Sequence, residues 1–210
     1  MRFVLFPMLH LGAPSLYEDV TRRLRDCDLV VAEGIRGRSV TASALVLTYE
    51  LFGRARRDGL VVQRIDYRSL GVPVVGPDMS ASEFREGWRH VPLTLRLGVW
   101  TLVPLYALGM LFFGSREVAA RNAEVDDLPT REEAEVLGDE HVAPFWRLLV
   151  DDRDAHLLSA LDRIHEERCG EAIQVGVVYG ASHMPAVVHH LSRRFGYWAH
   201  DADWMMVFER

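Results

Sequence analysis

Short apolar runs alternate along the chain with longer segments whose apolar residues recur every three or four positions. The apolar runs predict strands at residues 2–6, 29–34, 61–67, 72–78, 175–179 and 204–209. The helical spacing predicts helices at residues 15–26, 41–59 and 142–167, and another after residue 183. Ser15 and Glu18 are three residues apart, the spacing of a capping box at a helix start. Strands that alternate with helices indicate an α/β fold whose largely parallel sheet is covered by helices on both faces.

We expect residues 1–210 to form a single domain with a helical insertion at about residues 80–140. Within this insertion, residues 97–113 carry no charge, and their 17 residues approach the roughly 17 to 25 that a membrane-spanning helix needs. One crossing would separate the strands before it from those after it, so we predict that the segment does not span a membrane. Pro104 favours a kinked core helix. The alternative is a helix that makes a peripheral membrane contact or an oligomer contact.

The composition indicates a globular protein and argues against a nucleic-acid partner. The chain is 49% hydrophobic and 26% charged, which is typical of a globular protein. Its net charge of −6 argues against a nucleic-acid partner, and all 24 basic residues are arginine because the chain has no lysine. Cys27 and Cys169 lack the spacing of a metal site, so a reducing, cytoplasmic location is expected, with membrane association if residues 97–113 bind a bilayer.

Four predicted strands are each followed by a group that can bind a metal or move a proton: His10, Glu33, Asp78 and His183. Each has a structural explanation as a cap, a salt bridge or a buried histidine, but parallel strands bring their carboxyl ends to one edge. Two histidines and a carboxylate suit zinc or manganese and leave an open position for water. Alternatively, one histidine is a metal ligand and Glu33 is the general base. Gly180 suits a sharp turn under such a site.

Arg153 lies on the apolar stripe of the helix predicted at residues 142–167. The other members of this stripe are Trp146, Leu149, Leu157, Leu161 and Ile164. A buried guanidinium needs partners, so Arg153 either pairs structurally with Asp78 or Glu33, reaches solvent, or binds an anion or oxyanion at the site. The flanking Asp152 and Asp154 are expected to be exposed.

Together these motifs resemble the TraB/TIKI family. They are a histidine after the first strand, VVAEG at the second, DDRDAHLLSAL on the long helix and VVYGASHMPAVV near the end. The resemblance implies an EreA/ChaN-like α/β fold and, from the animal members, a protease supported by manganese or cobalt; bacterial members are linked to the shutdown of peptide pheromones. His10 and His183 match the histidines of the two Gly-x-x-His motifs, Glu33 the glutamate, Arg153 the helix arginine and Gly180 the second glycine. Pro7 stands where the first motif has glycine.

The resulting hypothesis is a metal-dependent, peptidase-like hydrolase that acts on a peptide or small-molecule substrate. Its catalytic residues would be His10, Glu33, Arg153 and His183, and its metal ligands His10, Glu33 and His183, with Asp78 and Gly180 as further candidates. The alternative is a non-catalytic protein that sequesters a peptide, a haem-like ligand or a metal, with His189, His190 and His200 as extra ligands. A serine hydrolase using Ser182 is disfavoured because GASHM lacks the second glycine of Gly-x-Ser-x-Gly.

Overall fold

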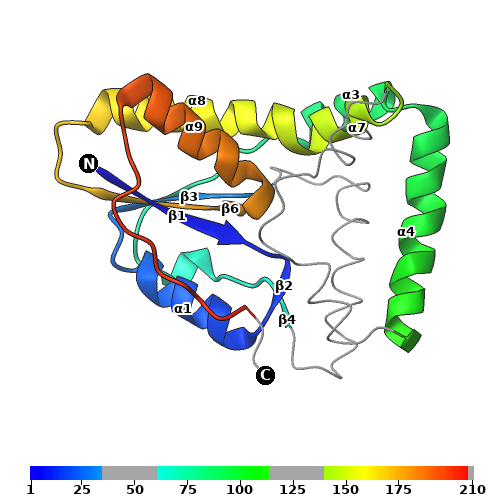
Figure 1. Ribbon diagram of the computed structural model, residues 1–210, viewed down its shortest axis with the longest axis horizontal. Coiled ribbons are helices and arrows are strands. Elements are labelled where there is room, and N and C mark those ends of the chain that lie inside the picture. The colour runs from blue at the N-terminus through cyan, green and yellow to red at the C-terminus, as the bar shows by residue number, and fades with distance from the viewer. Residues whose placement is uncertain (35–60, 114–139, 208–210) are drawn as a thin grey trace. The chain divides into compact units, whose positions relative to one another are not determined.

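The computed structural model describes residues 1–34, 61–113 and 140–207 (Figure 1). These residues divide into two compact units, one of residues 1–34, 63–78 and 153–207 and the other of residues 61–62, 79–113 and 140–152. The helix predicted at residues 41–59 and much of the predicted insertion lie outside the described residues. The assignment of residues 1–210 to a single domain stays a prediction.

A parallel four-stranded sheet forms the centre of the first unit, as predicted. Its strand order is β1 (Arg2–Met8), β6 (Gln174–Gly180), β3 (Leu29–Ala32) and β5 (Val74–Val75). Strand β6, the last strand of the described residues, therefore lies between β1 and β3. Its register pairs Met8 with Gly180 and Ala32 with Val178, so the carboxyl ends of these strands lie at one edge of the sheet.

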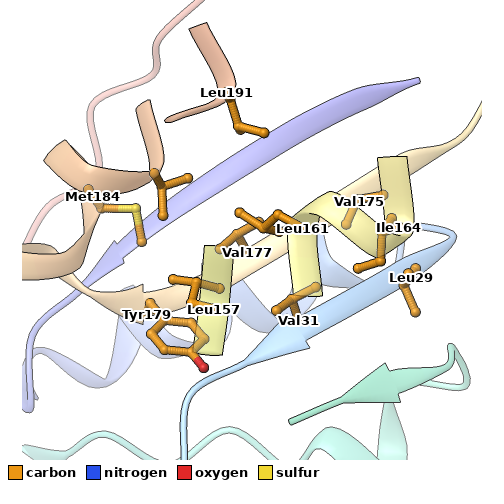
Figure 2. Packing of buried hydrophobic residues seen from close by; sticks show 11 residues of the cluster. Leu29, Val31, Leu157, Leu161, Ile164, Val175, Val177, Tyr179, Met184 and Leu191 are labelled. Carbon is orange, nitrogen blue, oxygen red and sulfur yellow. The ribbon is translucent and has the colours of Figure 1, made fainter. Parts of the chain in front are cut away.

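Helices cover both faces of this sheet (Figure 1), with α1 (Pro14–Leu24) on one face and α8 (Asp152–Arg168) and α9 (Met184–Phe195) on the other. Alternate strand residues point to opposite faces. On the α8 and α9 face, a buried cluster (Figure 2) contains Leu29, Val31, Leu157, Leu161, Ile164, Val175, Val177, Tyr179, Met184, Val187 and Leu191. On the α1 face, an added Cβ at Gly176 would lie 2.9 Å from Leu24 Cδ2 and 3.1 Å from Cys27 Sγ. Gly176 therefore lets α1 approach the sheet closely.

Three local predictions were wrong. Ser15 and Glu18 form no capping box, because α1 begins at Pro14 without a side-chain cap; the capping box is instead formed by Ser80 and Glu83 at the start of α3 (Ala81–His90). The strand predicted at residues 61–67 shortens to β4 (Val61–Val62), followed by the 3-10 helix η1 (Tyr67–Ser69). Residues 204–207 form no strand.

The second unit contains helices and a short strand. Besides α3, its helices are α4 (Leu93–Phe113), α7 (Ala143–Trp146) and the π-helix η2 (Arg147–Asp151). Its buried cluster comprises Met79, Phe84, Trp88, Val91 and Leu148. Pro104 lies inside α4, and none of the helices in the described residues is both long and apolar enough to cross a membrane.

The close approach of α1 to β6 predicts the effect of adding one methyl group. We expect Gly176→Ala to lower the free energy of unfolding by about 1–2 kcal/mol, because the methyl group displaces Leu24 and Cys27. Gly170→Ala is the matched control, since an added Cβ at Gly170 meets no atom within 4 Å. Urea unfolding of both variants checks this, and equal stabilities would contradict the packing described.

Candidate functional site

The carboxyl edge of the sheet gathers polar side chains from three neighbouring strands. Glu33 directly follows β3, Asp78 comes three residues after β5, and the turn after β6 carries His183. The first turn of α8 brings Arg153 and Asp154 to the same residues. Side chains that are far apart in the sequence thus meet where parallel strands end.

Arg153 joins two carboxylates. Its guanidinium contacts Asp78 at two points, from Nε to Oδ1 at 3.0 Å and from Nη2 to Oδ2 at 2.6 Å, and Nη2 also donates to Glu33 Oε1 at 2.5 Å. The Arg153 side chain is 13% exposed and that of Asp78 0%, so these charges are largely removed from water and compensate one another. Burial by itself lowers the pKa of the guanidinium, but the hydrogen bonds and charges of Asp78 and Glu33 outweigh it and hold the pKa above its usual value. Arg153 therefore forms the structural ion pairs with Asp78 and Glu33 that were one of the three interpretations of its place in the sequence.

Backbone amides complete the pairing of the two carboxylates. Glu33 Oε2 accepts a hydrogen bond of 2.7 Å from the Gly180 N–H, and Asp78 Oδ2 accepts one of 3.0 Å from the Gly34 N–H. Glu33 therefore ties the end of β3 to the end of β6. An added Cβ at Gly180 would lie 3.4 Å from Glu33 Oε2, so this glycine leaves room for the carboxylate.

His183 lies between two carboxylates. It is buried in the 3-10 helix η3 (Ala181–His183), and its Nδ1 lies 2.7 Å from Asp154 Oδ1. Because a carboxylate accepts, this contact places a proton on Nδ1 and leaves Nε2 on the side of Glu33, with Oε1 4.0 Å away. Asp154 was expected to be exposed, and its contact with His183 was not predicted from the sequence. The available signal was its position next to Arg153 on the same helical turn.

His10 lies two residues beyond β1, whose last residue Met8 is paired with Gly180. The segment that carries His10 thus leaves the sheet at the same edge as the site. Its side chain is exposed, and its carbonyl oxygen accepts a hydrogen bond of 2.9 Å from the Gln63 N–H. Participation of His10 in the site stays a prediction.

Glu33, one of the three predicted metal ligands, is already paired in the structure. Both Glu33 oxygens already accept hydrogen bonds, one from Arg153 and one from a backbone amide. Within the described part of the chain, no group of three or more His, Cys, Asp or Glu side chains is arranged to hold a metal ion. The Asp154–His183 contact matches the usual surroundings of a metal-binding histidine, whose second nitrogen commonly donates to a carboxylate. Dependence on a divalent metal stays a prediction.

The charges of the site affect the pKa values of two tyrosines, Tyr67 and Tyr179. Burial and the charge of Glu33 raise the pKa of Tyr67 to about 12, against the opposing effect of a hydrogen bond with Gln63. Burial likewise raises the pKa of Tyr179, and the carboxylate of Asp78 adds to this rise. Both phenols thus keep their protons at neutral pH and are hydrogen-bond donors.

Comparison of the chain with protein-family models, curated proteins and solved structures finds no match.

The Arg153 network predicts a large loss of stability when its cation is removed. Arg153→Met should lower the free energy of unfolding by about 3–5 kcal/mol, because Asp78 and Glu33 are left as buried, uncompensated charges. Arg22→Met, which removes an exposed ion pair with Asp19, should cost at most about 1 kcal/mol. The triple variant Arg153→Met/Glu33→Gln/Asp78→Asn also neutralises both carboxylates. It should regain part of the lost free energy of unfolding. Urea unfolding at pH 7 checks all three variants, and equal effects of the two single changes would contradict the network.

Stability should also fall at alkaline pH. Unfolded tyrosine titrates near pH 10, whereas Tyr67 in the folded protein titrates at about 12. Between these values the unfolded state has released its proton and the folded state has not, so the free energy of unfolding decreases as pH rises. Tyr67→Phe should reduce this slope by up to about 1.4 kcal/mol per pH unit and leave the slope between pH 7 and 9 unchanged. Urea unfolding over pH 7–11.5 measures both ranges, and identical alkaline slopes would contradict the assignment.

Proposed function

We propose that the protein is a hydrolase, with His183 as the general base at the carboxyl edge of the sheet. The observation that carries this proposal is the Asp154–His183 contact of 2.7 Å, which orients the imidazole and leaves Nε2 to accept a proton. Such a pair is the arrangement by which enzymes hold a histidine in the tautomer that activates water or a hydroxyl group. Peptides and small esters or lactones are the proposed substrates.

The charges around His183 support the proton transfer. When Nε2 takes a proton from the attacking water, the imidazolium has Asp154 at 2.7 Å and Glu33 Oε1 at 4.0 Å. Both carboxylates stabilise this cation in a site that is largely closed to water. Arg153 holds Glu33 in place and, being already paired with Asp78 and Glu33, acts here as a positioning residue.

The metal-dependent form of the hydrolase, and the relation to the TraB/TIKI family that suggested it, remain part of this proposal. In that form His183 would be a ligand. Metal analysis of the purified protein distinguishes the two forms: about one equivalent of a divalent ion that is lost in a His183 variant would favour metal dependence.

Replacement of His183 tests the proposal directly. Hydrolysis of a panel of peptides, esters and lactones should fall by about 10²–10⁴ in His183→Asn, because the base is lost while the Asn amide still donates to Asp154. His190→Asn is a matched control, because His190 Nε2 makes a contact of 2.6 Å with Asp162, another carboxylate of α8. This variant should keep full activity. Rates are compared for variants shown to be folded by circular dichroism.

Two outcomes would overturn the proposal. The first is a wild-type protein that hydrolyses no member of the panel, with or without added manganese, cobalt or zinc. The second is an active wild type whose rate falls equally in His183→Asn and His190→Asn, since the loss would then come from the packing of α8 and not from the chemistry of one imidazole.

A further inference from the structure

The hydroxyl of Tyr179 is buried and has no hydrogen-bond partner among residues 1–34, 61–113 and 140–207. Tyr179 is the penultimate residue of β6 and is 0% exposed. Within the described part of the chain, Tyr179 Oη is one of two buried side-chain polar atoms that no protein group pairs. Buried tyrosine hydroxyls are normally paired, because leaving one unpaired costs stability.

Another tyrosine of the first unit shows the usual arrangement. Tyr17 on α1 is also buried, and its hydroxyl donates to the carbonyl oxygen of Leu9 at 3.0 Å. The first unit can thus supply a hydrogen-bond partner to a buried tyrosine hydroxyl that has a purely structural role. The unpaired hydroxyl of Tyr179 is therefore available to a partner that the described residues do not supply.

This hydroxyl belongs to the candidate site. Figure 2 shows the Tyr179 ring at the end of the apolar cluster, with its oxygen directed away from the aliphatic side chains. The ring meets the imidazole of His183 edge to face, with 5.6 Å between the centroids. The next residue, Gly180, donates its N–H to Glu33. Asp78, Arg153, Glu33 and Asp154 all act on the pKa of Tyr179, which burial raises most, so the phenol lies within electrostatic reach of the charged network.

We propose that Tyr179 binds the substrate by donating its hydroxyl to a neutral carbonyl oxygen, that of an amide or ester, beside His183. This inference rests on the proposed hydrolase and adds a binding residue and a substrate class to it. Tyr179 would hold the carbonyl group, while the neighbouring imidazole activates the nucleophile.

The charge of the site selects a neutral acceptor over an anionic one. Among the described residues, the site holds three carboxylates, with Glu33 and Asp78 on the guanidinium of Arg153 and Asp154 on His183. That guanidinium already donates from Nε and Nη2 to two of them. A substrate carboxylate would enter an excess of negative charge, whereas an uncharged carbonyl oxygen needs only the phenol.

Stability provides the first arm of the test. Tyr179→Phe removes a hydroxyl that pairs with no group among the described residues, so the melting temperature should stay the same or rise. Tyr17→Phe is the matched control. It removes the hydrogen bond to the Leu9 carbonyl oxygen and should lower the melting temperature by about 2–4 °C. If Tyr179→Phe melts as low as Tyr17→Phe, the hydroxyl is held by a structural water and the proposal is overturned.

Binding provides the second arm and needs no turnover. Protein labelled at tyrosine Cζ is titrated with acetamide or acetate to about 100 mM, because ligands of four heavy atoms bind weakly. The resonance that disappears in Tyr179→Phe should shift saturably with acetamide, in the wild type and in His183→Asn. Acetate should shift it much less, and the Tyr17 resonance should not respond. An equal or larger response to acetate, or none to either compound, overturns the proposal.

Kinetics separate this inference from the hydrolase itself. Tyr179→Phe should lower kcat/KM for a neutral ester such as p-nitrophenyl acetate by about tenfold or more, since one donor to the carbonyl is lost. If acetamide binds at Tyr179 but the wild type hydrolyses nothing, only the hydrolase fails. If the wild type is active and Tyr179→Phe is unchanged in kcat/KM and in the acetamide titration, only the role of Tyr179 fails.

Discussion

The three-way contact of Arg153 with Asp78 and Glu33 is the interaction on which the first unit depends. It joins the residues that follow β3 and β5 to the first turn of α8, and all three side chains are largely buried. None of these charges is tolerable alone in such surroundings, so the three must assemble together. The edge of the sheet and the position of α8 are thereby specified by one electrostatic requirement.

That requirement also shapes the chemistry that the edge supports. Since Arg153 holds Glu33 through one oxygen and the Gly180 N–H holds it through the other, the carboxylate cannot turn away from His183. Asp154, which directly follows Arg153, is fixed by the same helical turn and orients the imidazole from the opposite side. The histidine is thus held by a rigid frame, as preorganised catalysis demands.

The sheet and the strand-end residues could be predicted because valine-rich runs mark buried parallel strands, whose ends must share an edge. The contact of Asp154 with His183 could not be predicted, because it depends on the rotation of α8 about its axis. A π-helix over residues 147–151 interrupts the helix predicted at residues 142–167 and adds a residue to one of its turns. The predicted apolar stripe is therefore buried at Leu157 and Leu161 but not at Trp146 and Leu149. The prediction of a capping box at Ser15 and Glu18 was wrong because α1 begins at Pro14, and its N-cap Ala13 has no side chain that can accept a hydrogen bond.

The strand order has a consequence for how the protein is made. On the ribosome, β1 and β3 are synthesised long before β6, yet they do not pair with each other, because β6 lies between them. A nascent chain that has not reached residues 174–180 thus has two apolar strands with unpaired edges, and Glu33 and Asp154 lack their partners Gly180 and His183. The sheet can close only after residues 174–180 have been synthesised, so the nascent chain has to be kept from aggregating until then.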